Sequence, residues 1–434
     1  MKNWKAMKAF SVMFLTFLLV VGCSNSSSTD KESSNDSDKE QVSISFWHIH
    51  SDGPMKETMT EILDDFEAEN PNIKVEELGI NFWDYWTKLS TAMAGGSGPD
   101  LALNDTSTLP ARAKSGAIMN IDSFIEKDKF DTDVFFPVLT EKMKHEGSFY
   151  GLPSDTDVRV LYYNKDHFRE VGLDPEKPPT NWAELEEYAE KLTKWKSDDL
   201  LERIGFSPSV GNLHMWTLAW GNGGDFWDEE GNPTFMKPEN LEALEWIAKM
   251  QENYGTKAMS AFNSQASSLQ YSPFIAEQVS MVVDVNNLYQ DIKTHAPDMD
   301  FGVAAIPFEK EQVTWSAGFD YEMTNNKDEK KAEATWELLK YMTSKDVQMK
   351  IHEVSGSLVS NMDAAKDPKF TEDPIWNLMV EQMQYSRFIE YVDALPSWHA
   401  NLDPVEQAVV NSGVDPKQAL QEAQTAAENA VKNH

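Results

Sequence analysis

Two carboxylates and a guanidinium stand close together where an apolar run begins. Asp155, Asp157 and Arg159 follow the turn Gly-Leu-Pro at 151–153 and precede the apolar run 160–163. Three charges beside a buried strand cost free energy unless they face a cleft, pair with each other or meet a polar ligand. Two carboxylates could act as acid and base, whereas a carboxylate and a guanidinium could bind hydroxyl groups. These residue types therefore predict a cleft position or an ion pair.

The sequence lacks the short signatures of common hydrolases and nucleotide-binding enzymes. It contains no Gly-x-Ser-x-Gly, no Gly-x-x-x-x-Gly-Lys-Ser/Thr and no His-Glu-x-x-His. His48 and His50 lie two apart at a strand end, but the histidines are otherwise scattered, which favours packed or solvated imidazoles over a metal site. With 72 acidic residues, no single carboxylate pair indicates a glycosidase. We expect no catalytic residue, no metal and no cofactor.

Tryptophan is the more informative residue type, because only one of the 14 precedes residue 22. Trp86, Trp195, Trp246 and Trp336 fall on apolar stripes and are assigned to helix cores. A second group lies at loop or strand ends among polar residues. A flat aromatic face matches the C–H face of a pyranose, and nearby polar side chains bind its hydroxyls. Each ring alone is equally well explained by packing at a domain edge, but the group as a whole favours carbohydrate binding: Trp47, Trp83, Trp182, Trp216, Trp220, Trp315 and Trp398.

The order of elements predicts an α/β protein. Strands are expected at 42–47, 72–78 and 99–105, with helices at 55–68 and 84–94 between them. This β-α-β-α-β order is typical of a parallel sheet with helices on both faces. The inward face of the second helix is predicted to hold Trp86, Leu89, Ser90 and Met93.

Residues 160 to about 300 are expected to form a second unit. Its capped helix starts at Asn181, with Glu184 at the third position, and carries Trp182, Leu185, Tyr188, Leu192 and Trp195. Further strands are predicted at 160–163, 203–208, 276–286 and 299–307, and later helices at 330–343, 345–354, 373–385, 401–411 and 416–432, the last begun by Asp415 and Pro416.

The first 41 residues have the composition of an export signal followed by a tether. Lys2, Lys5 and Lys8 precede the apolar run 9–21, which is too short for a membrane span. The only cysteine, Cys23, ends this segment in a pattern that resembles a bacterial lipobox, with Val20 where Leu is more usual. We therefore expect residues 1–22 to be removed and Cys23 to carry lipid. Residues 24–41 contain no aromatic or aliphatic side chain and are expected to be a flexible tether.

Charge and cysteine usage exclude several classes of protein. Removing the three signal lysines takes the formal net charge from −34 to −37. Such a surface disfavours nucleic acid and offers no basic patch to anionic lipid. Without a second cysteine there is no disulfide, so the core must supply the stability.

Four stretches resemble the family 1 extracellular solute-binding proteins of ABC importers. "AMAGGSGPDLALND" resembles their Gly-x-x-Pro-Asp element, and the stretch from Gly147 to Trp182 resembles their Gly-x-Tyr-Gly-Leu-Pro, Leu-Tyr-Tyr-Asn-Lys-Asp and Pro-Pro-Thr-x-Trp signature. "AEQVSMVVDVN" is similar to their Ala-Met strand, with Gln278 in place of Gly or Lys, and "KKAEATWELLKYMTSKDVQMKIHEVSGSLVSN" to their paired helices. The resemblance covers 42–434 and is most specific over 147–182.

The resemblance implies a two-lobe, type II periplasmic-binding-protein-like fold with the ligand in the cleft between lobes. The implied lobes are 42–153 plus 308–355 and 154–307 plus 356–434. Maltose-binding relatives carry a stacking Trp near the point occupied here by Asp284 to Asn287, so stacking is not expected there. The residues that the resemblance places at the ligand are Trp47, His48, His50, Asn104, Asp105, Asp155, Asp157, Arg159, His214, Trp216, Trp220, Asn222, Asp284, Asn286, Gly318, Phe319, Trp398 and His399.

The implied function is capture of a sugar, a di- or oligosaccharide, for delivery to the membrane permease of an ABC transporter. The protein is expected to be a monomer, lipid-anchored on the outer side of the cell membrane, with no nucleic-acid partner. Acidic cleft residues argue against anionic ligands, although Arg159 leaves a uronate open. Two alternatives remain: a receptor of the same fold for a polyamine or glycerol phosphate, and a surface glycoside hydrolase with Asp155 or Asp157 as acid.

Overall fold

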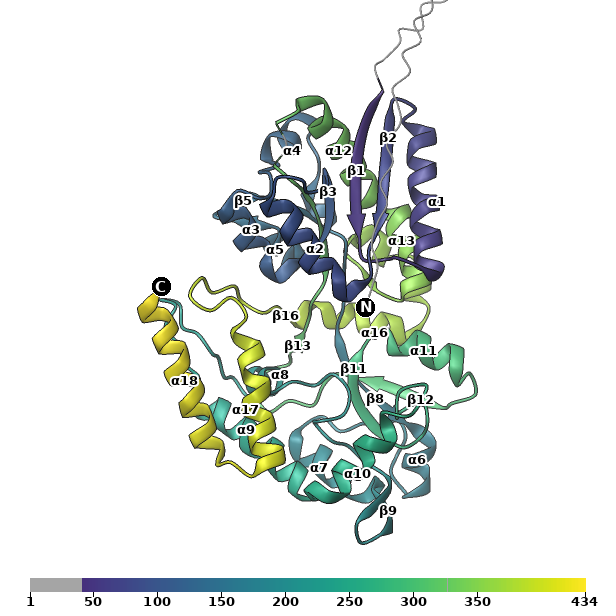
Figure 1. The fold of residues 1–434 in the computed structure, drawn as a ribbon. Helices are drawn as coiled ribbons and strands as arrows, with labels where there is room; N and C mark the ends of the chain where they lie inside the picture. The colour runs from purple at the N-terminus through teal and green to yellow at the C-terminus, as the bar shows by residue number, and fades with distance from the viewer. Residues whose placement is uncertain (1–40, 326) are drawn as a thin grey trace, which may run out of the picture. The chain divides into compact units, whose positions relative to one another are not determined.

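A five-stranded sheet contains the predicted β-α-β-α-β unit (Figure 1). In the computed structural model, which describes residues 41–434 except residue 326, β1 (Val42–His48) pairs in parallel with β2 (Ile73–Gly79) and β3 (Leu101–Asp105). β14 (Phe319–Met323) continues the sheet antiparallel to β3, and β6 (Leu152–Pro153) pairs with β14 at the edge. The carboxyl ends of the three parallel strands therefore lie at one edge of the sheet, where ligands of such sheets bind.

Apolar helices cover both faces of this sheet. On one face, α1 (Gly53–Glu69), α12 (Glu329–Met342) and α13 (Lys345–Ser355) share a core with the sheet. On the other face, α2 (Phe82–Ala94) buries Tyr85 and Leu89. The predicted inward position of Ser90 is wrong, because the i, i+4 pair Tyr85 and Leu89 faces the sheet and turns Ser90 to solvent.

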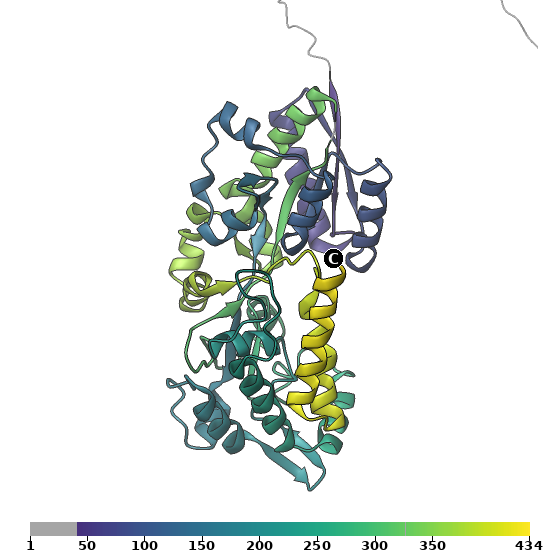
Figure 2. The same ribbon diagram turned by 90° about the vertical axis from the view of Figure 1, so that its left-hand side faces the viewer.

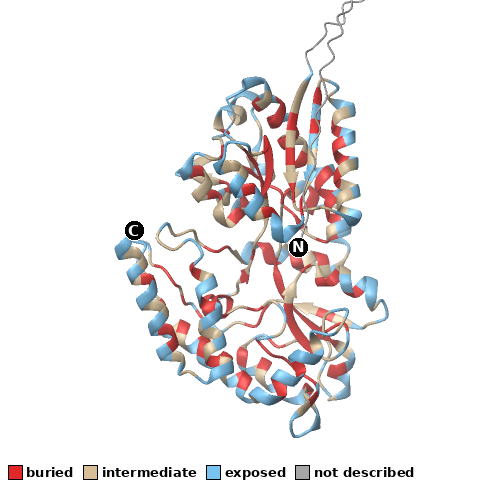
Figure 3. Ribbon diagram, in the orientation of Figure 1, coloured by how far each residue is buried: buried red, intermediate tan, exposed pale blue. Residues whose placement is uncertain are grey.

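A second, separate sheet has three antiparallel strands. β8 (Arg159–Asn164), buried along its whole length, pairs with β11 (Met281–Val285) on one side and β12 (Phe301–Ala304) on the other. Figure 3 shows buried residues concentrated in both sheets and on the helix faces that cover them. The two sheets thus carry separate apolar cores.

The helix predicted from Asn181 begins as predicted but ends before Trp195. The Asn181 side chain accepts a hydrogen bond from the Glu184 amide and starts α7 (Trp182–Leu192). The Thr193 hydroxyl donates to the Ala189 carbonyl at the end of this helix, and the chain turns into the hairpin of β9 (Lys194–Ser197) and β10 (Leu200–Arg203). Trp195 is therefore an exposed strand residue, and its assignment to a helix core is wrong. Of the predicted strand at 203–208, only Arg203, the last residue of β10, and Ile204, which makes a single bridge with Val279, pair as strand residues, and the rest of that prediction is wrong.

Helices form most of the second half. α8 (Met215–Gly221), α9 (Pro238–Glu252) and α10 (Thr256–Ala266) precede β11, and α11 (Leu288–His295) follows it. The predicted late helices are confirmed as α16 (Pro374–Gln382), α17 (Leu402–Ser412) and α18 (Pro416–Asn433). α17 and α18 lie side by side (Figure 2). The remaining short elements are η1 (Thr106–Thr108), α3 (Leu109–Ser115), α4 (Asp122–Asp128), η2 (Thr132–Val134), α5 (Pro137–Lys142), β4 (Lys144–His145), β5 (Ser148–Phe149), α6 (Lys165–Glu170), α14 (Met362–Ala365), α15 (Pro368–Thr371), η3 (Met383–Tyr385) and η4 (Trp398–Asn401).

Within the described residues, three chain segments pass between the two sheets and bind one another. The first segment joins β6 to β8, the second joins β12 to β14, and the third joins α13 to α14. β7 (Asp155–Thr156) in the first segment pairs with β15 (Leu358–Val359) in the third. In the second segment, β13 (Thr314–Trp315) pairs with β16 (Ser386–Arg387). The Thr156 hydroxyl donates to the Ala317 carbonyl at 2.9 Å, joining the first segment to the second. A Cβ atom at Gly318 would lie 2.4 Å from the Asp155 carbonyl oxygen, so this close approach requires glycine.

Some predictions concern the N-terminal segment and the lobe boundaries. Cys23 and residues 24–40 of the expected tether lie outside the described residues. The expected division into one lobe of residues 42–153 plus 308–355 and another of residues 154–307 plus 356–434 stays a prediction. In the described part of the chain, no helix combines the length and apolar character that a membrane span requires.

Candidate functional site

Two adjoining pockets lie beside the second crossing segment. They share Asp105, Ala317 and Gly318 in their linings. The larger, of about 510 Å³, also contains Trp315 and His399, and the smaller, of about 300 Å³, also contains His50, Asp155, Asp157 and Phe319. Seven of the residues predicted to contact a ligand are thus brought together here: His50, Asp105, Asp155, Asp157, Gly318, Phe319 and His399.

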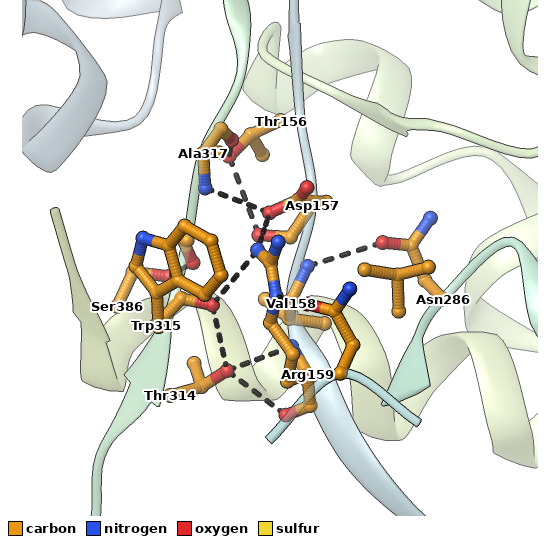
Figure 4. A network of polar contacts seen from close by, with 12 residues as sticks. Thr156, Asp157, Val158, Arg159, Asn286, Thr314, Trp315, Ala317 and Ser386 are labelled. Atoms are coloured by element: carbon orange, nitrogen blue, oxygen red, sulfur yellow. Dashed lines mark hydrogen bonds and ion pairs between the residues drawn. The ribbon is translucent and has the colours of Figure 1, made fainter. Parts of the chain in front are cut away.

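Arg159 is buried, and other groups of the protein bind its guanidinium (Figure 4). It forms an ion pair with Asp157, donates from Nε to Asn212 Oδ1 at 2.9 Å, and donates to the Trp315 carbonyl at 3.2 Å. Its Cζ atom also lies 3.8 Å from the centre of the Trp315 ring, a cation–π contact. Arg159 therefore holds Trp315 in place, and the Asp157 carboxylate balances the positive charge of Arg159.

The two predicted carboxylates tie the first crossing segment to the second. Asp157 Oδ1 accepts a hydrogen bond from the Ala317 amide at 2.7 Å, and Asp155 Oδ1 accepts one from the Phe319 amide at 3.1 Å. Burial raises the pKa of Asp155 to about 7, and it also raises the pKa of Asp157. Both carboxylates combine a bracing role with a place in the lining of the smaller pocket.

Four rings form an aromatic wall, defined as His214, Trp216, Trp315 and His399. His214 stacks on Trp216 with centroids 4.1 Å apart, and Trp315 meets both rings edge-on at 4.8 and 5.2 Å. His399 meets Trp216 edge-on at 5.6 Å. Burial lowers the pKa of His214 to about 4, and it also lowers that of His399, so both imidazoles are neutral at pH 7. The larger pocket thus has an uncharged aromatic side, formed by Trp315 and His399 over the buried Trp216.

His48 is held inside the protein at the end of β1. Its Nδ1 accepts from the His50 amide at 3.2 Å, so Nε2 carries the proton and contacts Glu77 Oε1 at 2.9 Å. Although burial opposes it, hydrogen bonds from His48, Lys56 and Thr60 lower the pKa of Glu77 to about 2. His48 is completely buried, so it supports the strand end and presents no atom to a pocket. His50 lines the smaller pocket instead, and burial lowers its pKa to about 4.

Asn104 precedes the pocket residue Asp105 in β3 and binds a buried ion pair. Its Nδ2 donates at 2.9 Å to Glu322, which also forms an ion pair with Arg112. Asp320 lies on the same strand as Glu322 and is completely buried. Burial and the neighbouring Glu322 charge raise the pKa of Asp320 well above its ordinary value, which favours the neutral acid. Asp105, by contrast, is only partly buried and lines both pockets.

Several predicted ligand residues are packed into the core in this structure. The Trp398 ring is 1% exposed and donates from Nε1 to the Glu390 carbonyl at 3.0 Å. Asn286 accepts from the Val158 amide and donates to the Gly356 carbonyl, joining the first and third crossing segments. Such contacts position the chain and leave no free face for a ligand. The predicted residues that line neither of the two pockets are Trp47, His48, Asn104, Arg159, His214, Trp216, Trp220, Asn222, Asp284, Asn286 and Trp398.

The structure also adds residues that were not predicted as ligand contacts. Trp315 was grouped with the loop tryptophans but was not placed at the site. Phe388 and Tyr391 line the larger pocket from a segment without a recognisable motif. Only contacts between distant parts of the chain bring them there. Among the described residues, no cluster of three or more His, Cys, Asp or Glu side chains is placed to hold a metal ion.

Comparison with known proteins places this geometry in context. The family model of the bacterial extracellular solute-binding protein matches residues 61–377. A putative binding protein of Brucella abortus (strain 2308) is 26% identical over 349 residues, 79% of this chain and 82% of that protein. The sn-glycerol-3-phosphate-binding periplasmic protein UgpB of Brucella melitensis biotype 1 is 24% identical over 429 residues, 90% of this chain and 92% of that protein.

Solved structures share the fold. The structure of CpMnBP1 with mannotriose bound superposes with a TM-score of 0.77 at 27% identity, covering 89% of this chain and 100% of that one. This likeness and the two sheets joined by crossing segments confirm the predicted two-lobe α/β fold.

Proposed function

Because the chain belongs to the bacterial extracellular solute-binding protein family, we propose that it captures a neutral di- or oligosaccharide between its lobes for an ABC importer. Closure of the lobes around the sugar would signal occupancy to the membrane permease. The protein performs no chemistry on the ligand in this proposal.

The aromatic wall is the observation that carries the proposal. Trp315 is partly exposed to the larger pocket, and the Arg159 guanidinium 3.8 Å from its ring centre fixes its orientation. A rigid indole face can stack against the C–H face of a pyranose, while Asp105 and His399 beside it bind hydroxyl groups. Pockets of about 300 to 1,000 Å³ hold small-molecule ligands, and the larger pocket falls in that range. CpMnBP1, which is similar in fold, has been solved with mannotriose bound.

The charge of the larger pocket favours a neutral ligand over a phosphate. Neither of its two lysines is a free cationic donor. Lys144 pairs with Glu141 at 2.6 Å, and burial lowers the pKa of Lys142. A phosphate needs a surplus of cationic donors. The acidic lining residues Asp105, Glu141, Glu390 and Asp393 instead outnumber Lys142 and Lys144.

Glycerol phosphate remains the second candidate, because UgpB is a relative over most of both chains. A polyamine is a further candidate, supported by the acidic lining of the larger pocket. Hydrolysis by Asp155 or Asp157 has less support, because each carboxylate already accepts a backbone hydrogen bond from the second crossing segment.

A lipid anchor at Cys23 would place the receptor on the outer side of the cell membrane. Cys23 is the only cysteine and ends an apolar export signal. Cys23→Ser expressed in a bacterial cell should leave the membrane fraction, whereas the unchanged protein should stay in it. Equal membrane retention of both would contradict the anchor.

A thermal-shift screen tests the ligand class. Residues 24–434 would be melted with maltose, maltotriose, mannobiose, mannotriose, spermidine and sn-glycerol 3-phosphate. A binder at about 100 times its Kd adds about 2.7 kcal/mol to the free energy of unfolding, which gives a clear rise in Tm. A shift with a neutral saccharide supports the proposal. A shift with only spermidine or glycerol phosphate would overturn the sugar assignment and retain the receptor.

A further inference from the structure

The rim of the first sheet exposes an aromatic pair that the pocket linings do not include. Among the described residues, Trp83 is the most exposed large apolar side chain, at 83%, and its neighbour Phe82 is 38% exposed. Both stand at the start of α2. Leaving an indole in water forgoes the free energy of burying it, so such a ring at a rim indicates a binding surface.

A row of rings connects Trp83 with the smaller pocket. Trp83 meets Phe82 edge-on with centroids 5.1 Å apart, and Phe82 meets Trp86 edge-on at 5.7 Å. Trp86 in turn stacks on Phe319 at 6.1 Å with an interplanar angle of 15°. Phe319 lines the smaller pocket. The exposed pair is therefore the outer end of an aromatic row whose inner end reaches the candidate site.

The backbone under this pair is held firmly. The Asn81 side chain accepts a hydrogen bond from the Trp83 amide at 3.1 Å and caps α2. One turn later, the buried Tyr85 hydroxyl contacts the carbonyls of Leu103 and Trp47 at 2.7 and 3.0 Å. A helical residue with these supports keeps its direction better than a residue in a loop. The position of the Trp83 backbone, from which the ring projects, is thus fixed by the helix and its cap.

The position of α2 directs the pair toward the ligand. α2 follows β2, whose carboxyl end lies beside that of β1, and β1 lies beside β3 in the same sheet. Ligands of such sheets bind outside these carboxyl ends. Asn81 and Asp84 flank the rings and supply hydroxyl-binding groups. This combination of a flat ring and small polar groups suits a sugar unit. A stable protein–protein interface would instead need about 800 Å² of buried surface on each partner, so we assign the pair to a sugar.

We propose that Trp83 and Phe82 form an outer subsite for the distal unit of an oligosaccharide whose inner units occupy the two pockets. This inference rests on the proposed sugar-binding function and adds a preference for longer chains. The outer ring then contributes affinity only when the ligand is long enough to reach it.

Calorimetric titration of chain-length series tests the subsite. The probes are mannobiose, mannotriose and mannohexaose, and maltose, maltotriose and maltohexaose. Trp83→Ala should weaken binding of the hexaose of the recognised series by about tenfold, which corresponds to about 1.4 kcal/mol. Its effect on the disaccharide should be small. Trp83→Phe keeps a flat ring and should restore most of the hexaose affinity. Trp195→Ala removes an exposed indole from the distant β9–β10 hairpin and should change nothing.

Each outcome decides a separate question. A length-dependent loss in Trp83→Ala, with unchanged Tm, supports the outer subsite. An equal loss for all lengths, or no loss for any, overturns it. If the unchanged protein binds no saccharide of either series but does bind spermidine or glycerol phosphate, the proposed function fails first and the subsite fails with it. A normal sugar affinity combined with an unaffected Trp83→Ala variant refutes the subsite alone.

Discussion

Removal of the Asp157 carboxylate should destabilise the protein more than the loss of an exposed ion pair. The Arg159 side chain is 6% exposed, and in Asp157→Ala its guanidinium would keep only neutral hydrogen-bond partners, with the Asp284 carboxylate as the remaining opposite charge nearby. Breaking a buried pair in this way costs about 3–5 kcal/mol. The Ala317 amide also loses its acceptor, at 2.7 Å in this structure. Because Asp157 itself is 24% exposed, water replaces part of these contacts, and we expect a loss of about 3 kcal/mol.

Urea unfolding at pH 7 measures this loss from the transition midpoint and slope. Asp157→Asn keeps the shape and an acceptor for the Ala317 amide but removes the charge, so its loss should be smaller. Glu333→Ala provides a matched control, since the Lys127–Glu333 pair is more than half exposed on both sides. Exposed pairs contribute about 0–1 kcal/mol, so this variant should remain close to the unchanged protein.

Two results would contradict a bracing role of the Asp157–Arg159 pair. If Asp157→Ala loses no more than Glu333→Ala, the Asp157–Arg159 contact behaves as a surface pair and does not brace the crossing segments. If Asp157→Leu combined with Arg159→Met is less stable than Asp157→Ala alone, the cost does not come from an uncompensated buried charge, because an apolar replacement of both partners should relieve it.

The remaining predictions concern three buried or partly buried side chains. Burial raises the pKa of Asp155 to about 7, so the folded state retains a proton that the unfolded state releases near pH 4. The free energy of unfolding should therefore fall as the pH rises from about 4 to about 7, and Asp155→Asn should flatten this slope in urea unfolding at several pH values; an unchanged slope would contradict the assignment. Asp320→Asn should be at least as stable as the unchanged protein at pH 7, because burial favours the neutral form of Asp320; a clear drop in Tm would show that its charge is needed. Trp398→Ala should cost about 3–5 kcal/mol in the same assay, with sugar affinity unchanged; selective loss of affinity at unchanged stability would make Trp398 a ligand contact.

Most elements of the fold could be predicted because their signals are local. The apolar stripe of α1, the Asn181 cap of α7 and the Asp415 cap of α18 each lie within one or two turns of chain. Errors arose where a distant contact decides the outcome. The Thr193 hydroxyl at the end of α7 also accepts a hydrogen bond from the Gly205 amide across a hairpin. No local sequence pattern predicts that contact.

The candidate site was predicted only in part for the same physical reason. Asp157 and Arg159 are two residues apart on an extended chain, so their pairing follows from the period of a strand. A tryptophan among polar residues, however, looks the same in sequence whether its ring faces a ligand or packs under the loop. Trp398 and Trp216 pack, whereas Trp315 faces the pocket because Arg159, far away in the chain, holds it there.

The charges at the start of β8 connect ligand contact with the geometry of the crossing segments. Asp155 and Asp157 bind the amides of Phe319 and Ala317, and Arg159 holds the Trp315 ring. Residues 315–318 line the larger pocket and residues 317–319 line the smaller one, and the same segment passes between the two sheets. In the proposed function, a ligand that contacts Trp315 or Gly318 would act directly on the segment that connects the two lobes. Under the proposed function, the same buried contacts would serve both ligand binding and closure.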